Sequence, residues 1–342
     1  MEMAENIDIE GGLHYVRDDM PGYRRIRRGR GFSFLGPDGK PVRKPEVIER
    51  LRNLVIPPAW EEVWISPNPQ GHIQATGRDA RGRKQYIYHP RWNEIRSESK
   101  FDRVAPFAQV LPRIRERVDL DLRRPPFSRQ TALAFVVTLL DKTHLRVGHP
   151  KYARQNNSYG VTTLLDYHVE VIGTHLLMKF RGKSGQIQEV NIRHRKLARI
   201  ARQYQELPGQ ELIQYQNGSG EFQTVDSGEV NEYLREITGD DFTAKDFRTW
   251  GGSVCAASEL HRLGPSDTRK GAKAKIVGAI RRTAYKLGNT PAVCRKYYVH
   301  PRVIEAYLDG TLSLIMAESD TDADGNCSGL SNEEAAVLKL LE

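Results

Sequence analysis

The segment Asn289–His300 reads Asn-Thr-Pro-Ala-Val-Cys-Arg-Lys-Tyr-Tyr-Val-His, and the interpretation of the whole chain starts from it. Thr290 and Pro291 predict the start of a helix, because Thr caps free N–H groups and Pro is tolerated at the first helical position. Pro301 then interrupts the segment. We therefore expect a short helix of about two turns that ends at two adjacent tyrosines.

These tyrosines, Tyr297 and Tyr298, directly follow Arg295 and Lys296. Nearby positive charge favours the phenolate and lowers a tyrosine pKa from its ordinary value of about 10. One of the two is thus a candidate nucleophile. The residues alone leave a second reading open, because a tyrosine is more often a half-buried packing residue.

The composition is basic. The 342 residues include 52 Lys plus Arg and 43 Asp plus Glu, which gives a net charge of +9 and a pI near 9.4. Such an excess suits a polyanionic partner without identifying one. No apolar run approaches the about 20 residues of a membrane span, and the N-terminus has no signal pattern. We expect a soluble, cytoplasmic protein of one large or two smaller domains.

The cysteines Cys255, Cys294 and Cys327 are odd in number and far apart, which argues against a disulfide framework and a Cys-rich metal site. The chain also lacks a Gly-rich phosphate loop followed by Lys and Ser or Thr. We expect no metal site and no cofactor, ATP included. Side chains would then have to perform any chemistry on phosphate.

The first part of the chain predicts a flexible acidic lead over residues 1–20 and a small domain over residues 21–99. Alternating apolar residues and turn residues indicate its elements. They are strands over residues 31–35, 62–66 and 72–76 and a helix over residues 45–54. The basic run Tyr23–Arg30 has two readings, a solvated face or a contact to phosphates.

The run Gly77–Pro90 gathers charge in a turn and leads into a strand. Along this strand Gln85 would face one way and Tyr86 and Tyr88 the other. Arg and Lys bind backbone phosphates, and Gln and Tyr reach sugars, phosphates or base edges. The alternative is a basic hairpin with two half-buried tyrosines.

Residues 100–317 predict a larger, mainly helical domain, and residues 318–342 an acidic mobile tail with a short C-terminal helix. A strong helix follows Ser128, with apolar residues at the spacing of one buried face: Leu133, Val136, Val137 and Leu140. Further helices are expected over residues 193–205, 227–237, 268–287 and 332–341.

Three cations in this domain are placed at element ends. Arg146 follows the strong helix, where a positive charge is favoured by the helix dipole. Lys183 lies in a Gly-Lys-Ser-Gly turn between two strand-like runs, which indicates a hairpin tip. Thr243 and Asp246 form a capping-box pattern that predicts a helix start, and Arg248 then lies where free N–H groups favour phosphate.

The motifs resemble, in this order, those of one family. Gly288–Lys296 with Tyr298–Pro301 is similar to the nucleophile segment of type IB DNA topoisomerases, in particular their small bacterial, poxvirus-like branch. In that family the tyrosine immediately before Val-His-Pro attacks DNA, which implies Tyr298 and excludes Tyr297. The implied fold is α+β, a small N-terminal domain of mixed sheet and helix with a larger, mainly helical catalytic domain that carries a β-hairpin.

Two upstream segments, Leu145–Gly148 and Phe247–Gly251, resemble those that carry the family's catalytic arginines, and they imply Arg146 and Arg248. The family keeps a general-acid lysine on a mobile hairpin, which implies Lys183. Asn289 stands where poxviral and eukaryotic members have histidine. Because an amide cannot transfer protons, the resemblance leaves Asn289 a hydrogen-bonding role only.

The implied activity is relaxation of supercoiled duplex DNA through a 3′-phosphotyrosyl intermediate at Tyr298, without ATP or required metal. The implied state is a monomeric clamp on DNA, acting at the nucleoid. The residues expected to contact DNA are Arg83, Lys84, Gln85, Tyr86, Tyr88, Lys151 and Tyr152. A tyrosine site-specific recombinase is the alternative enzyme, and a non-catalytic DNA-binding protein is the alternative of another class.

Overall fold

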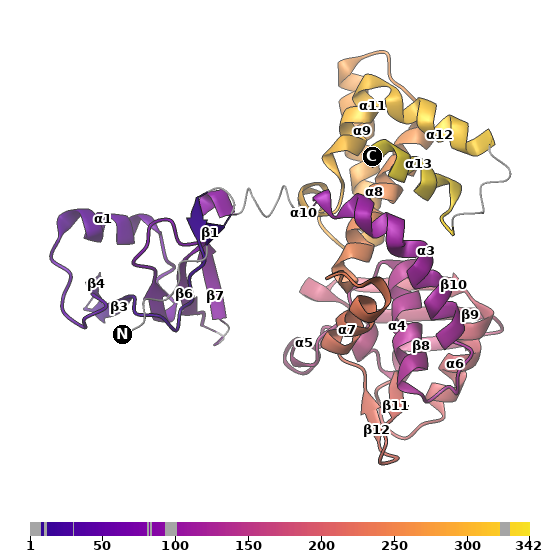
Figure 1. The fold of residues 1–342 in the computed structure, drawn as a ribbon, viewed down its shortest axis with the longest axis horizontal. Helices are drawn as coiled ribbons and strands as arrows, with labels where there is room; N and C mark the ends of the chain where they lie inside the picture. Colours follow the sequence, from indigo (N-terminus) through magenta and orange to yellow (C-terminus); the bar gives the residue numbers. More distant parts are fainter. Residues whose placement is uncertain are drawn as a thin grey trace. The chain divides into compact units, whose positions relative to one another are not determined.

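The computed structural model describes residues 8–9, 12–29, 31–80, 82, 84–92, 101–321 and 329–342 (Figure 1). The chain divides into two compact units, Met1–Lys100 and Phe101–Glu342. Among the described helices, none combines the length and the apolar character that a bilayer crossing requires.

The N-terminal unit is built on a five-stranded sheet with the order β4-β3-β5-β6-β7, and its paired strands are antiparallel. Its elements are β1 (Asp8–Ile9), β2 (Leu13–His14), β3 (Tyr23–Arg28), β4 (Gly31–Leu35), α1 (Pro45–Asn53), β5 (Glu61–Ile65), β6 (Ile73–Arg78) and β7 (Lys84–Tyr88). One sheet face packs against α1 in a small core of Phe34, Leu51, Val63, Ile65 and Ala75. The predicted strands and helix are confirmed to within two residues at each end.

The basic run at the start of this unit is a strand, β3, and one of its arginines has a structural role. The guanidinium of Arg25 donates to the carbonyl oxygens of Ile56, Pro57 and Trp60 at 2.9, 3.0 and 2.8 Å. It also lies 4.1 Å from the ring centroid of Phe32. Arg25 therefore holds the loop between α1 and β5, a role that neither sequence-based reading of the run included.

The lead that the sequence suggested to be flexible is packed from Leu13 onward. Leu13 is fully buried, and the indole of Trp64 donates to the carbonyl oxygen of Met20 at 2.9 Å. Asp18 accepts a hydrogen bond from Thr76 at 2.9 Å. The segment covers Trp64, which would otherwise expose a large apolar side chain on the sheet.

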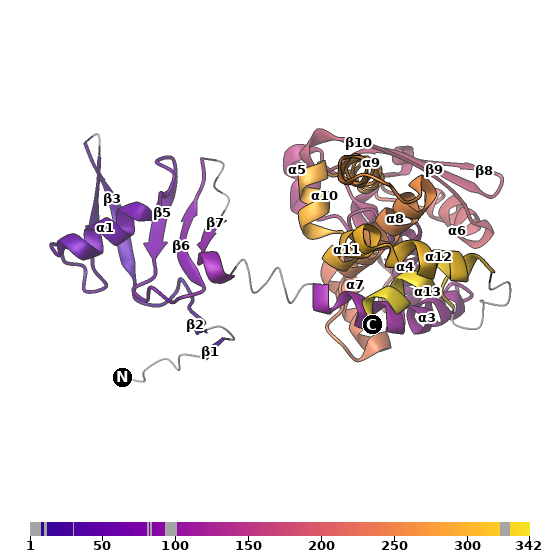
Figure 2. The same ribbon diagram turned by 90° about the horizontal axis from the view of Figure 1, so that it is seen from above.

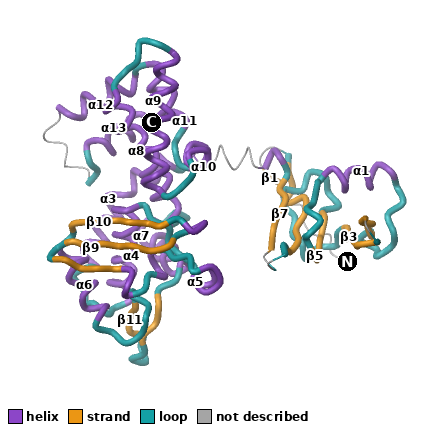
Figure 3. Tube along the Cα trace, turned by 180° about the vertical axis from the view of Figure 1, so that it is seen from behind, coloured by secondary structure: helices purple, strands orange, loops and turns teal. Residues whose placement is uncertain are grey.

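The C-terminal unit is mainly helical, and a three-stranded antiparallel sheet with the order β10-β9-β8 lies beside its helices (Figure 3). Its elements are α3 (Val104–Asp121), α4 (Arg129–Thr143), α5 (Pro150–Asn156), β8 (Val169–Ile172), β9 (His175–Arg181), β10 (Ile187–Arg193), α6 (Arg195–Gln205), β11 (Gln214–Gln216), β12 (Phe222–Thr224), α7 (Ser227–Thr238), α8 (Ala244–Leu263), α9 (Arg269–Leu287), α10 (Pro291–Tyr297), α11 (Pro301–Asp309), α12 (Thr311–Thr321) and α13 (Asn332–Leu341). The predicted hairpin is β9–β10, and the α+β fold class is confirmed.

Helix α4 is buried on all sides, with no exposed or half-buried residue from Thr131 to Leu140. The apolar spacing in the sequence indicated one buried face only. The difference arises because α4 contacts α3, α7 and α8 as well as β10 and β11, so it lies inside the unit (Figures 1 and 2). This central position makes the end of α4 a fixed point for the residues that follow it.

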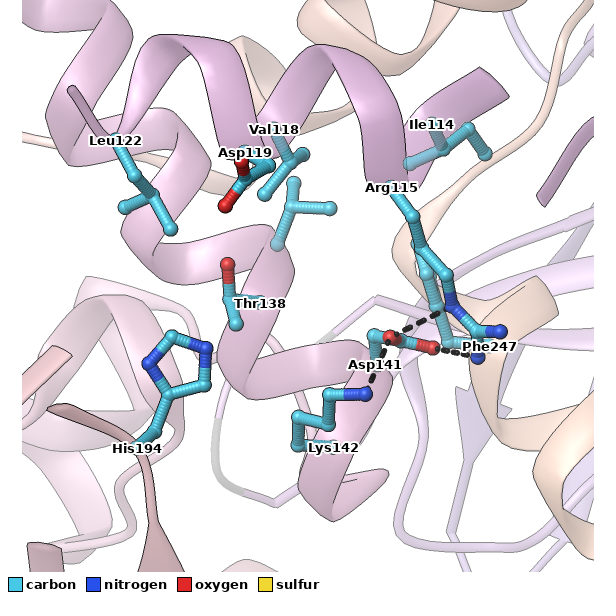
Figure 4. A pocket seen from close by; sticks show the side chains of 11 residues that line it. Ile114, Arg115, Val118, Asp119, Leu122, Thr138, Asp141, Lys142, His194 and Phe247 are labelled. Carbon is cyan, nitrogen blue, oxygen red and sulfur yellow. Dashed lines mark hydrogen bonds and ion pairs between the residues drawn. The ribbon is translucent and has the colours of Figure 1, made fainter. Parts of the chain in front are cut away.

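The C-terminal helix α13 is tied to the centre of the unit by Arg115 of α3. Arg115 donates to Asp141 of α4 at 2.9 and 3.1 Å and to Glu334 of α13 at 2.7 and 2.8 Å. Glu334 also accepts from the Trp250 indole at 3.3 Å. Figure 4 shows the Arg115–Asp141 pair beside a cavity of about 140 Å³. The expected mobile tail is helical as far as Thr321, and residues 322–328 lie outside the described part of the chain.

We predict that Glu334→Ala lowers the free energy of unfolding by about 3 kcal/mol, because it leaves the largely buried Arg115 without one of its two carboxylates. Burial opposes ionisation of Glu334, but Arg115 outweighs it and holds the pKa of this carboxyl below its ordinary value. Its stabilising contribution is therefore complete at neutral pH and is lost as the pH falls through that lowered pKa. Urea unfolding at pH 7 measures the difference.

The matched control is Glu333→Ala, which removes the same charge from the same helical turn at an exposed position. We expect it to change the free energy of unfolding by less than about 0.5 kcal/mol. Equal losses in the two variants would show that Glu334 acts only through the charge of the helix start.

Candidate active site

Arg248 lies near the start of α8 and is only 4% exposed. Its Nη1 donates to the carbonyl oxygen of His144, the left-handed residue that ends α4, and its Nη2 donates to that of Leu287 at 2.8 Å. Burial lowers the pKa of Arg248, and Tyr298 opposes this effect. The Arg248 guanidinium thus links the C-terminal ends of α4 and α9.

Arg146 follows α4 by three residues and lies in the same cluster. It donates from Nη2 to the carbonyl oxygen of Gly288 at 3.1 Å and to Oδ1 of Asn289. Burial, and then repulsion from the Arg248 charge, lower the pKa of Arg146 to about 10. Since this value is well above 7, Arg146 is a cation at neutral pH.

Two hydrogen-bond donors at this cluster have no acceptor. Within the described residues, Arg248 Nε and Asn289 Nδ2 are buried and form no hydrogen bond. A buried donor without an acceptor costs about 1–3 kcal/mol. Two such donors, beside the buried guanidinium of Arg248 and the half-buried guanidinium of Arg146, create a site that an anionic oxygen would satisfy.

Tyr298 directly follows α10 as its C-cap residue and is partly buried. The Cζ atom of Arg248 lies 4.9 Å from the centroid of the Tyr298 ring. Tyr297, in contrast, is 40% exposed, and its ring centroid lies 5.3 Å from Nζ of Lys296. The structure therefore brings Tyr298 to the arginine cluster.

The backbone around Tyr298 is held by two small residues of α8. Tyr298 N donates to the Cys294 carbonyl at 2.9 Å, and a Cβ atom on Gly252 would collide with the Tyr298 carbonyl oxygen. Ser253 Oγ accepts from the backbone N–H of His300 at 3.0 Å. The imidazole of His300 accepts from Arg302 N at 3.1 Å, so it caps α11 and has a structural role.

The sequence interpretation missed His144 and Gly251. Burial lowers the pKa of the His144 imidazole to about 4, so it is neutral at pH 7. A Cβ atom on Gly251 would collide with this ring. The signal was the Gly251–Gly252 pair inside a helical pattern, because glycine in a helix interior costs about 1 kcal/mol and indicates a close approach.

Lys183 lies at the hairpin tip, where a short 3₁₀ turn, Lys183–Gly185, joins β9 to β10. The Gly182 N–H donates to the Gln186 carbonyl at 2.7 Å and closes the turn. The Lys183 side chain is exposed and forms no hydrogen bond or ion pair within the described part of the protein. Four of the five expected catalytic residues form one cluster, and the fifth lies on the adjoining hairpin.

The expected DNA contacts of the N-terminal unit fall on both faces of its sheet. Tyr86 and Tyr88 stack with centroids 5.8 Å apart, and Lys84 Nζ lies 5.6 Å from the Tyr86 centroid. Lys84 also pairs with Asp18 at 2.6 Å. Gln85 alternates to the other face and donates to Asp79 at 2.9 Å. Arg83 lies outside the described residues.

The remaining expected contacts, Lys151 and Tyr152, lie on the short helix α5, five and six residues after Arg146. Tyr152 is 51% exposed, and its ring centroid lies 5.6 Å from that of His149. Both side chains are thus accessible, but neither belongs to the arginine cluster.

Comparison with known proteins identifies the family. Residues 89–320 match the family described as eukaryotic DNA topoisomerase I, catalytic core, and residues 31–79 match the bacterial DNA topoisomerase IB N-terminal domain. The chain is 32% identical over 313 residues to DNA topoisomerase 1B of Acanthamoeba polyphaga mimivirus, covering 89% of this chain and 93% of that protein. The chain belongs to the type IB DNA topoisomerase family.

More distant relatives of this type IB topoisomerase are also viral. DNA topoisomerase 1B of vaccinia virus (strain Copenhagen) is 21% identical over 301 residues, with 85% of this chain and 90% of that protein covered. DNA topoisomerase I of monkeypox virus is 21% identical over 297 residues, with the same coverage. The resemblance stated from the motifs is confirmed, and the protein is an isomerase of a family that acts on DNA. The strand Lys84–Tyr88 lies between the two matched regions.

Proposed function

We propose that this type IB topoisomerase relaxes supercoiled duplex DNA through a transient covalent bond between Tyr298 and a DNA 3′ phosphate. The observation that supports the proposal is the packing of Arg248 against the Tyr298 ring, with a 4.9 Å separation, beside the unsatisfied donors of Arg248 and Asn289. A nucleophile and an anion-binding cluster are thereby adjacent.

The first step is attack of the Tyr298 oxygen on a DNA phosphorus. Charge then builds on the non-bridging phosphate oxygens, and Arg146 and Arg248 meet it with planar donors that are cations at neutral pH. Asn289 adds a neutral hydrogen bond from its unpaired Nδ2. Because the protein supplies the positive charge, the proposed reaction requires no divalent metal.

The P–O5′ bond breaks as the Tyr298–phosphorus bond forms. Alkoxide is a poor leaving group, so the departing O5′ takes a proton, and we assign this general-acid role to Lys183. The free 5′ hydroxyl later attacks the phosphotyrosyl bond and reseals the strand. The covalent bond conserves the energy of the broken phosphodiester, so resealing requires no ATP.

The test is relaxation of supercoiled plasmid in EDTA without ATP. Part of the reaction is denatured while it is still in progress, which traps any covalent adduct between protein and DNA. We expect relaxed topoisomers and a covalent adduct in which peptide mapping finds Tyr298 joined to a 3′ phosphate. Site-dependent exchange between two plasmids would instead favour a recombinase. DNA binding without relaxation would leave a binding protein only.

We further propose that both units bind the duplex, that a monomer is sufficient, and that the protein works at the nucleoid. Phosphate contacts would dominate binding, so log affinity should fall with log salt with a slope of about −0.9 per neutralised phosphate. The expected face of the N-terminal unit includes Lys84, Tyr86 and Tyr88, beside a polar cavity of about 240 Å³.

We predict that Asp18→Asn increases duplex affinity and steepens the salt slope by about 0.9, because Lys84 then becomes available to one more phosphate. In the free protein the Lys84–Asp18 pair raises the pKa of Lys84 and lowers that of Asp18, although burial of Asp18 opposes the latter. Filter binding across a salt series measures both quantities.

The matched control is Asp19→Asn, which removes the same charge from the next residue. Asp19 is exposed and pairs with Arg17 rather than with the sheet. We expect little change in its salt slope. Identical slopes for the two variants would assign the effect to net charge alone.

A further inference from the structure

Gln188 of β10 extends from the hairpin turn toward the arginine cluster. A Cβ atom on Gly182 would lie 3.0 Å from Gln188 Cγ, and one on Gly288 would lie 2.6 and 2.7 Å from its Nε2 and Oε1. The stem of the side chain therefore contacts the base of the turn, and its amide contacts Gly288. Strand β10 is an edge strand of its three-stranded sheet (Figure 3).

Both ends of this contact belong to the proposed machinery. Gly182 immediately precedes Lys183, and Gly288 immediately precedes Asn289 and accepts a hydrogen bond from Arg146. Gly288 has φ +59°, a left-handed conformation, and no side chain of its own. Gln188 thus fills the space between the hairpin that carries Lys183 and the residues that would hold the phosphate.

Gln188 contacts Gly182 and Gly288 by van der Waals packing rather than by hydrogen bonds. The Gln188 side chain is half-buried, and its amide forms no hydrogen bond to any of the residues that the structure describes. The backbone N–H of Tyr159 donates to the Arg181 carbonyl at 2.8 Å and holds the base of the hairpin, whereas the backbone hydrogen bonds of Gly182 and Gly185 lie within the turn itself. Because a general acid must come within about 2.6–3.2 Å of its oxygen, a shift of the tip by about 1 Å is costly.

We propose that Gln188 is a positioning residue that sets where Lys183 stands relative to the scissile phosphate. This inference rests on the proposed function, in which Lys183 protonates the leaving O5′. Removing the side chain would leave the phosphate-binding cluster intact and let the hairpin move. The defect should therefore appear only when leaving-group protonation limits the rate.

A DNA duplex with sulfur in place of the scissile O5′ distinguishes a defect in leaving-group protonation from a defect in the phosphate-binding cluster. On ordinary DNA the Tyr298 oxygen–phosphorus bond forms, the P–O5′ bond breaks, and O5′ takes the proton of Lys183. With sulfur the P–S bond breaks and the sulfur leaves as a thiolate. No proton is required, because a thiol has a pKa of only about 8.5.

The experiment is single-turnover cleavage of matched oxygen and sulfur duplexes at a mapped site. We expect Gln188→Ala to slow cleavage of ordinary DNA about 10- to 100-fold and to cleave the sulfur duplex within about 3-fold of wild type. Lys183→Ala should show a larger loss on ordinary DNA and the same rescue. Non-covalent affinity for the duplex should not change.

Two further variants test whether the size of the Gln188 side chain, rather than its amide group, is responsible for the effect. Gln186→Ala removes an exposed glutamine side chain from the same hairpin and should cleave both duplexes like wild type. Gln188→Met keeps the length of the side chain without its amide and should restore cleavage of ordinary DNA to within about 3-fold of wild type. If Gln188→Met is as slow as Gln188→Ala, hydrogen bonding is responsible and the spacer role is rejected.

The remaining outcomes distinguish a failure of the Gln188 inference from a failure of the proposed function on which it rests. If Lys183→Ala is rescued by sulfur and Gln188→Ala is equally slow on both duplexes, only the role of Gln188 is wrong. If Lys183→Ala is not rescued, the general-acid assignment fails and takes the positioning role with it. Wild-type rates for Gln188→Ala on ordinary DNA would also overturn the inference.

Discussion

Tyr298→Phe is expected to lower plasmid relaxation by about 10⁴-fold or more while duplex affinity is retained, since removal of a nucleophile eliminates the covalent route. The variant loses only the hydroxyl, so the phenyl ring still packs beside Arg248, whose Cζ lies 4.9 Å from the ring centroid. The fold should be unchanged. Relaxation assays over a wide range of enzyme concentration, with filter binding in parallel, measure both quantities.

The control is Tyr297→Phe, which removes a hydroxyl from the adjacent residue. Tyr297 lies beside Lys296 rather than beside Arg248, and its backbone belongs to the same short helix. We expect relaxation within about 3-fold of wild type, as for a surface substitution away from the site. Full activity in Tyr298→Phe and loss in Tyr297→Phe would transfer the nucleophile to the neighbour.

Local patterns were sufficient for the elements that carry the site. The Thr-Pro start of α10 and the hairpin around Lys183 appear as predicted, and α13 begins and ends where expected. Each depends on a cap, a turn or a period within a few residues, which a sequence shows directly. The assignment of Tyr298 over Tyr297 needed more, because both are tyrosines in the same charged helix.

Contacts between distant residues were beyond the sequence patterns. Arg146 and Asn289 are 143 residues apart and share a hydrogen bond, and no spacing in the chain indicates it. The burial of α4 on all sides likewise depends on its neighbours. Gln188 belongs to no sequence motif, and only its packing against Gly288 indicates a role. Tertiary packing, rather than propensity, decides all three.

The charge state of the site also became apparent only from packing. In the sequence, Arg248 is a cation near a helix start, where free N–H groups favour phosphate, and nothing there indicates burial. In the structure it is 4% exposed, and its hydrogen-bond acceptors are the carbonyl oxygens of His144 and Leu287. Burial lowers its pKa, as expected for a cation in a site of low polarity. Such a cation is costly to the fold and favourable to a bound phosphate.

The cost of burying Arg248 and its benefit to a bound phosphate predict a large effect of substituting this residue. Arg248→Met keeps most of the side-chain volume and removes the charge, and we expect it to slow DNA cleavage about 10³-fold, because a buried donor to the transition state is lost. The free energy of unfolding should change by less than about 2 kcal/mol. Two carbonyl oxygens lose a donor at about 1–3 kcal/mol each, but relief of a buried guanidinium offsets this loss by several kcal/mol.

Single-turnover cleavage and urea unfolding of the same variant measure the two effects. Arg295→Ala is the control, because Arg295 is exposed three residues before Tyr298 and its charge is screened by salt. We expect that variant to retain cleavage within about 3-fold of wild type. If Arg248→Met unfolded far more easily and cleaved normally once folded, Arg248 would hold the ends of α4 and α9 together and have no part in phosphate chemistry. If Arg248→Met slows cleavage without lowering the free energy of unfolding, the charge of Arg248 serves the bound phosphate rather than the fold.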